Sequence, residues 1–303
     1  MNPGSILSLA GAIACVFACT GPAVAQERGL DTAKIEEITG LKGTWNETEG
    51  VFKVSAPRTD LKVSVDRWTM PPFMGLTSWA AFQKGKVAET MVMGDLVLLQ
   101  DEVNPVMSEL LGAGVAVTAL HNHFFYDEPR AYFMHLGGEG ETQALARGVR
   151  RAFDKVKKIR AAHPEGAPGF GGEALPEKSS ITGKAIEEVI GQKGQTQDGM
   201  FKVVIGRKTK SACGCELGKE MGVNTWAAFA GADENAVVDG DLAVLEAELQ
   251  GVLKSLRASG INIVAIPQHM TLETPRILFL HYWGRGKAAD LARGVKTALD
   301  TEK

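Results

Sequence analysis

The sequence has no excess of basic residues and lacks the common nucleotide-binding and hydrolase motifs. Its 303 residues include 33 lysines and arginines against 36 aspartates and glutamates, which gives a formal net charge of −3. Nucleic-acid-binding proteins need a clear basic surface, so this balance argues against such a partner. No Gly-x-Ser-x-Gly elbow, phosphate-binding loop or dinucleotide fingerprint after a strand is present. The composition, 45% hydrophobic and 23% charged, is that of a folded globular protein.

Charged side chains are missing from residues 1–25. An apolar stretch at 6–19 is followed by Gly21-Pro22 and then by the small residues Ala23-Val24-Ala25. This order is typical of a secretory signal peptide and predicts cleavage after Ala25. The stretch of about 14 residues is short for a permanent transmembrane helix, so we expect a periplasmic or secreted protein without a span after processing. A retained anchor, or a lipid attached to Cys19 in Val16-Phe17-Ala18-Cys19, is the alternative.

The chain contains an internal duplication. Residues 94–154 align with residues 240–300 without a gap, and 23 of the 61 positions are identical. We therefore predict two copies of one unit of roughly 125 residues. The predicted organisation is a signal peptide at 1–25, a first repeat at 26–160, a linker rich in proline and glycine at 161–180, and a second repeat at 181–303.

Each copy reads as a mixture of helices and strands. Apolar spacings of three and four residues predict an amphipathic helix from Leu96 to Leu110 and from Leu242 to Leu256, with Asp95 and Asp241 as N-caps. In the first copy Pro105 would lie deep in this helix, so a start at Asp101 or Asn104 is the alternative. The remaining pattern predicts helices at 32–39 and 141–157 and strands around 51–55, 62–68, 78–82, 115–124 and 131–136. The order ββ(β)αββα, with a hairpin in place of crossovers, indicates an α+β fold in two tandem copies. We expect a pseudo-twofold relation between them, with two similar sheets or one shared sheet.

Three of the six histidines cluster in the first repeat. His121 and His123 are two residues apart on a predicted strand, so their side chains leave the same face. The next strand returns antiparallel and brings His135 near them, while Glu128 lies at the end of the hairpin. Three imidazoles and a carboxylate suit zinc best, and also iron, nickel or copper. The sequence therefore predicts a divalent metal site on His121, His123, His135 and Glu128.

The second copy carries only part of this set. His123 and His135 recur as His269 and His281, whereas Pro267 and Thr274 replace His121 and Glu128. The recurring histidines therefore fit a structural role as hydrogen-bonded core groups, and the two replaced residues distinguish the first copy.

Two classes of function follow from the cluster. The first is a protein that binds a metal or small ligand without chemistry. The second is a metal-dependent hydrolase in which Glu128 acts as general base. Arg130, after the hairpin proline, could bind an anionic ligand, although a salt bridge to Asp95 or Glu102 explains it equally well.

Copper handling is a further alternative. Cleavage of the leader would leave Cys213 and Cys215, which form a strained bridge, a soft-metal pair or two free thiols. Their segment aligns with that of Met70 and Met74, whose thioethers suit Cu(I), although these methionines also fit an apolar loop.

Several segments together resemble a known family. They are Gly94-Asp95-Leu96, Ala119-Leu120-His121-Asn122-His123, Glu128-Pro129-Arg130 and Phe133-Met134-His135. These motifs resemble the LppY/LpqO family of exported bacterial proteins and lipoproteins, which carry two copies of a domain of unknown function. The resemblance covers nearly the whole mature chain and implies an envelope location, but no activity.

Overall fold

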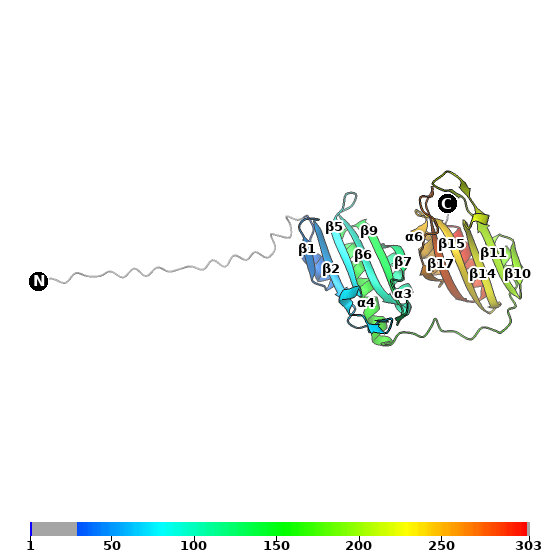
Figure 1. The fold of residues 1–303 in the computed structure, drawn as a ribbon, viewed down its shortest axis with the longest axis horizontal. Coiled ribbons are helices and arrows are strands. Elements are labelled where there is room, and N and C mark those ends of the chain that lie inside the picture. The colour runs from blue at the N-terminus through cyan, green and yellow to red at the C-terminus, as the bar shows by residue number, and fades with distance from the viewer. Residues whose placement is uncertain (2–28, 302–303) are drawn as a thin grey trace.

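The computed structural model describes residue 1 and residues 29–301 (Figure 1). The predicted signal peptide, with its cleavage site and Cys19, lies outside the described residues. No helix in the described part of the chain is long and apolar enough to span a membrane.

The first repeat is a six-stranded antiparallel sheet in the order β1-β2-β5-β6-β9-β7. Its strands are β1 (Gly43–Asn46), β2 (Val51–Pro57), β5 (Thr77–Lys84), β6 (Thr90–Leu99), β7 (Ala116–His121) and β9 (Ala131–Gly140). Its helices are α2 (Thr32–Thr39), α3 (Gln100–Gly112) and α4 (Thr142–Ala162). A smaller sheet of β3 (Ser64–Val65), β4 (Trp68–Thr69) and β8 (Asp127–Glu128) and the short 3-10 helix η1 (Pro72–Met74) complete it.

The second repeat has the same order, β10-β11-β14-β15-β17-β16. Its strands are β10 (Gly194–Gln197), β11 (Met200–Gly206), β14 (Asn224–Ala232), β15 (Asn235–Leu245), β16 (Asn262–Ala265) and β17 (Ile277–Gly286). Its helices are α5 (Gly183–Ile190), α6 (Leu249–Ala258) and α7 (Ala288–Leu299), with the hairpin β12 (Thr209–Lys210) and β13 (Glu216–Leu217) and the 3-10 helix η2 (Lys219–Met221). The α+β class and the duplication are confirmed.

Alternating burial along the strands gives each sheet two different faces. In the first repeat, Leu96, Leu98, Met134 and Leu136 face the helices and join the main core with Val149 of α4 and its neighbours. The opposite face carries a separate apolar cluster at one end only, where Val63, Met70 and Leu76 cover Val97, Ala131 and Phe133. In the described part of the chain, the helices of the first repeat pack on the other face.

The predicted helix beginning near Leu96 and Leu242 is wrong at its N-terminal end. Both segments are strands, β6 and β15, and the helices α3 and α6 begin later, at Gln100 and Leu249. Residues 96–99 are buried on both faces of the sheet, so the strand shows no polar alternation and resembles a helix in sequence. The N-cap prediction for Asp95 and Asp241 is therefore also wrong, because both lie inside strands.

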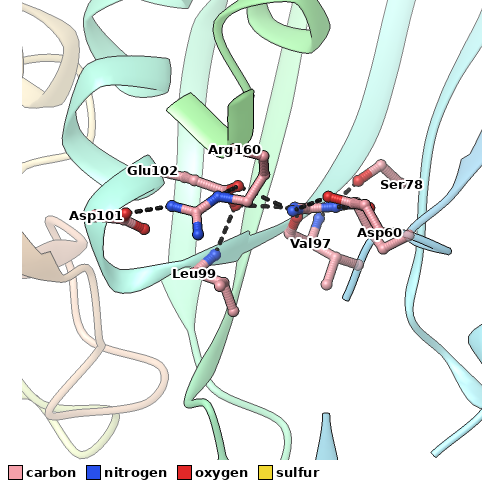
Figure 2. A network of polar contacts seen from close by, with 8 residues as sticks. Asp60, Ser78, Val97, Leu99, Asp101, Glu102 and Arg160 are labelled. Carbon is pink, nitrogen blue, oxygen red and sulfur yellow. Dashed lines mark hydrogen bonds and ion pairs between the residues drawn. The ribbon is translucent and has the colours of Figure 1, made fainter. Parts of the chain in front are cut away.

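A buried ion-pair network joins the sheet to the helices in the first repeat. The Glu102 carboxylate, 0% exposed, accepts hydrogen bonds from Arg58 at 2.9 Å and from the Leu99 amide at 2.8 Å. Figure 2 shows Arg160 reaching both Asp101 and Glu102. In the second repeat Glu248 pairs with Arg207 and the Leu245 amide in the same way. Glu102 is thus held by other arginines, and the salt bridge predicted for Arg130 to Glu102 is wrong.

Contacts between the repeats obey a pseudo-twofold relation. The Asn104 side-chain amide donates to the Ile263 carbonyl at 3.0 Å and accepts from its amide at 2.7 Å. Gln250, which aligns with Asn104, makes the same pair of bonds to Val117, which aligns with Ile263. Helices α3 and α6 contact each other at this junction, where Figure 1 places them between the two sheets. The two copies therefore share one continuous core.

Candidate functional site

The histidines gather on the sheet face that the helices leave uncovered. His135 lies on β9 between Met134 and Leu136, which point into the helix-covered core, so its own side chain leaves the opposite face. Strand pairing places it opposite Asp95 of β6 on one side and Ala119 of β7 on the other. Directly opposed residues have Cβ atoms about 4.5–5.5 Å apart, so an imidazole and a carboxylate are brought within reach of one ion.

The structure brings two of the three imidazoles together, and the strand expected at 115–124 ends at His121, so that His123 lies beyond β7. The Nε2 atoms of His121 and His135 lie 3.0 Å apart. The His123 ring stacks beside His121 with 5.1 Å between centroids, and it also lies flat on Phe133 at 3.3 Å. Two nitrogens bound to one tetrahedral zinc at about 2.0–2.1 Å are roughly 3.3 Å apart, close to the observed separation. Phe133 thus orients one imidazole, while the hairpin return orients the other two.

The carboxylate nearest this cluster is Asp95. Its Oδ1 atom is buried and has no hydrogen-bond partner among the described residues. Burial raises the pKa of Asp95, and the charges of His135, His123 and His121 act in the opposite direction. Burial also lowers the pKa of His123, with a further lowering from His121. His123 is therefore biased toward the neutral form, which is the form that ligates metals.

Glu128 and Arg130 lie elsewhere on the hairpin. Glu128 belongs to β8, pairs with Ser64 of β3 and has an exposed side chain. Arg130 is also exposed. Among the described contacts, none joins either side chain to the histidines. Asp95 is the residue that sequence reasoning missed, although its presence as Gly94-Asp95-Leu96 and again as Gly240-Asp241-Leu242 was a usable signal.

The second repeat reproduces part of this geometry. Asp241, His269 and His281 each offer a ligand atom within 4.8 Å of the others. Pro267 lies at the position of His121, so the close pair of Nε2 atoms has no equivalent there.

The two remaining cysteines lie at the tip of the β12–β13 hairpin. Both are exposed free thiols with Sγ atoms 2.9 Å apart. Hydrogen bonds from Cys215 and then from Ser211 lower the pKa of Cys213 to about 7. In the aligned segment of the first repeat, Met70 is buried in the apolar cluster and Met74 is exposed.

Comparison with known proteins gives little functional information. No curated protein matches the chain. A solved structure described as a trimeric bacterial microcompartment shell protein PduB is similar at 11% identity and a TM-score of 0.22, over 85% of this chain and 89% of that one. This TM-score and this sequence identity are too low to indicate a shared fold or role.

The family comparison is informative about the repeats. Residues 33–155 and residues 184–301 each match a family described as Domain of Unknown Function (DUF1259). The two matches coincide with the two sheets and their helices, and they support the predicted duplicated domain of unknown function. Membership of the LppY/LpqO family stays a prediction. Because the matches cover well over half of its length, the chain belongs to the family of the Domain of Unknown Function (DUF1259).

Proposed function

We propose that this protein is an exported divalent-metal-binding protein whose first repeat holds the ion on His121, His123, His135 and Asp95. The 3.0 Å separation of the His121 and His135 Nε2 atoms is the observation that carries the proposal. Asp95 replaces Glu128 as the carboxylate ligand because it lies opposite His135 in the sheet. Three imidazoles and one carboxylate fit zinc best, with iron, nickel and copper as further candidates.

The competing explanation treats the histidines as ordinary polar groups of the core. Such groups are buried and hydrogen-bonded to one another or to the backbone. Here His123 is exposed, and the inner oxygen of Asp95 lacks a partner among the described residues. The N–H···N bond between His121 and His135 satisfies neither of these groups, and a cation bound at the cluster would give the Asp95 oxygen a partner.

Metal storage or transfer is favoured over hydrolysis by the number of donors. A catalytic zinc keeps three protein ligands and an open position, and the first-repeat cluster offers four donors. The exposed Glu128 side chain on β8 is also poorly placed as a general base, since its described contacts are with β3.

The test is zinc titration of the metal-free mature chain in competition with a chromophoric chelator. His121→Ala and Asp95→Asn should each weaken the tightest site by about 10- to 100-fold or more, because loss of even an indirect ligand contact has an effect of this size. Glu128→Ala is the matched control and should leave it unchanged. Unchanged zinc affinity in His121→Ala would refute the proposed site, and a loss confined to Glu128→Ala would return the carboxylate role to that residue.

Export is tested separately. N-terminal sequencing of protein recovered from the periplasmic fraction should begin at Gln26. Protein that retains Met1 in the cytosol would contradict export, and a lipid on Cys19 would establish anchoring.

A further inference from the structure

The second repeat has its own group of metal-ligating side chains. Asp241 lies on β15 opposite His281 of β17, in the register that Asp95 and His135 have in the first repeat. His269 follows the edge strand β16 and completes the group, with all three ligand atoms within 4.8 Å of one another. Its Nε2 atom is 3.9 Å from an Asp241 carboxylate oxygen.

The environment of Asp241 is unfavourable for a carboxylate without a cation. The residue is only 4% exposed, and its Oδ1 atom is buried with no hydrogen-bond partner among the described residues. Burial raises the pKa of Asp241, while His281, His269 and a backbone hydrogen bond at Leu280 act to lower it. A buried charge is tolerated when it is paired or when it coordinates a metal.

The imidazoles around this carboxylate are held in position. His269 stacks on Phe279 with 3.6 Å between ring centroids, as His123 stacks on Phe133. Its side chain is 39% exposed, so an ion can reach the group from solvent. Pro267 offers no ligand atom where the first repeat has His121.

We propose that Asp241, His269 and His281 form a second divalent-metal site with three protein ligands, and that it binds more weakly than the first-repeat site. This inference goes beyond the proposed function because all three ligands come from the second repeat. A site with three protein ligands leaves a coordination position for water or an exogenous ligand. On the sequence alone, the recurring histidines of the second repeat fit a structural role. Under this proposal, the second repeat instead carries the more open of the two sites.

The experiment is titration of the metal-free full chain with Zn²⁺, monitored by calorimetry, and with Co²⁺, monitored by visible absorption. The wild type should bind two ions per chain in two phases, the second about 10-fold or more weaker because a ligand is missing. Asp241→Asn and His281→Ala should abolish the second phase and leave the first. Asp239→Asn removes the same charge from the same strand and should retain both phases.

Different variants test the first-repeat site and the second-repeat site, so failure of one proposal is distinguishable from failure of the other. His121→Ala should lose the tight phase and keep the weak one, and if it loses neither, the first-repeat site is wrong. A second phase that persists in both Asp241→Asn and His281→Ala would overturn the second site, as would a stoichiometry of one ion that only first-repeat variants alter. Circular dichroism of each variant establishes that the lost phase is not due to unfolding.

Discussion

The junction between the repeats combines a shared apolar core with two side-chain amides, and replacing one amide tests how strongly the copies are coupled. Asn104 is 5% exposed and makes two hydrogen bonds to the backbone of Ile263, at 2.7 and 3.0 Å. A hydrogen bond contributes a net 0.5–1.5 kcal/mol, so Asn104→Ala should lower the free energy of unfolding by about 1–3 kcal/mol. The upper end applies if the Ile263 N–H and C=O groups stay buried without partners.

Gln250 provides the internal comparison. It makes the equivalent pair of bonds to Val117 but is only partly buried. Water can replace its bonds more easily, so Gln250→Ala should destabilise the protein less than Asn104→Ala. Both amides hold the same junction, so the double variant should lose less stability than the sum of the single losses.

The assay is urea denaturation followed by tryptophan fluorescence and circular dichroism. Asn224→Ala is the control, since that amide makes one bond, to Lys219, within the second repeat. The wild type should unfold in one transition with both probes, and Asn104→Ala should shift the midpoint or separate the probes. A change below about 0.5 kcal/mol, the size expected of surface substitutions, would mean that the Asn104 hydrogen bonds contribute little to the junction.

Three further predictions concern stability, thiol chemistry and the linker. Glu102→Gln should cost about 3–5 kcal/mol in thermal or urea unfolding because it removes the fully buried carboxylate that Arg58 and Arg160 share, and Glu248→Gln should cost less, since Glu248 is less deeply buried. In reduced protein, the alkylation rate of Cys213 should rise with a midpoint at about pH 7, and Cys215→Ala should move that midpoint upward; a midpoint that stays in place would exclude the Cys215 hydrogen bond as the cause. Limited proteolysis should cut the exposed linker within 168–172, and the two fragments should co-elute in gel filtration because the junction holds them; separation would contradict a shared core.

Much of the fold was predictable from local sequence. The helix expected at 32–39 coincides with α2, and the strands expected around 51–55, 78–82 and 131–136 lie within β2, β5 and β9. These segments have one buried and one open face, so their burial follows the period of the element. The helix predicted at 96–99 was wrong because both faces of this strand are covered. Helices cover one face, and Val63, Met70 and Leu76 cover the other, so apolar and polar residues do not alternate along the strand.

The candidate site was predictable only where its geometry is local. The contact of His121 with His135 follows from a hairpin, in which sequence spacing sets the register. Asp95 could not be found in this way, because β9 inserts between β6 and β7 and so pairs with a strand far away in sequence. Glu128 is closer in sequence to the histidines than Asp95 is, but it lies in the small sheet, where β8 pairs with β3.

Comparison of the two repeats distinguishes side chains that stabilise the fold from side chains that do not. Both repeats have the pairs Arg58–Glu102 and Arg207–Glu248, and each glutamate also accepts from the amide at the end of a strand, which stabilises the turn into a helix. The Asp–His–His groups occur in both repeats as well, and in each an aspartate oxygen is buried without a described hydrogen-bond partner and one imidazole is exposed. A buried carboxylate oxygen without a partner is costly, and the two proposed metal sites would give this oxygen a partner in both copies. Under these proposals, the replacement of His121 by Pro267 removes one donor from the second site, and we expect the two sites to differ in affinity for this reason.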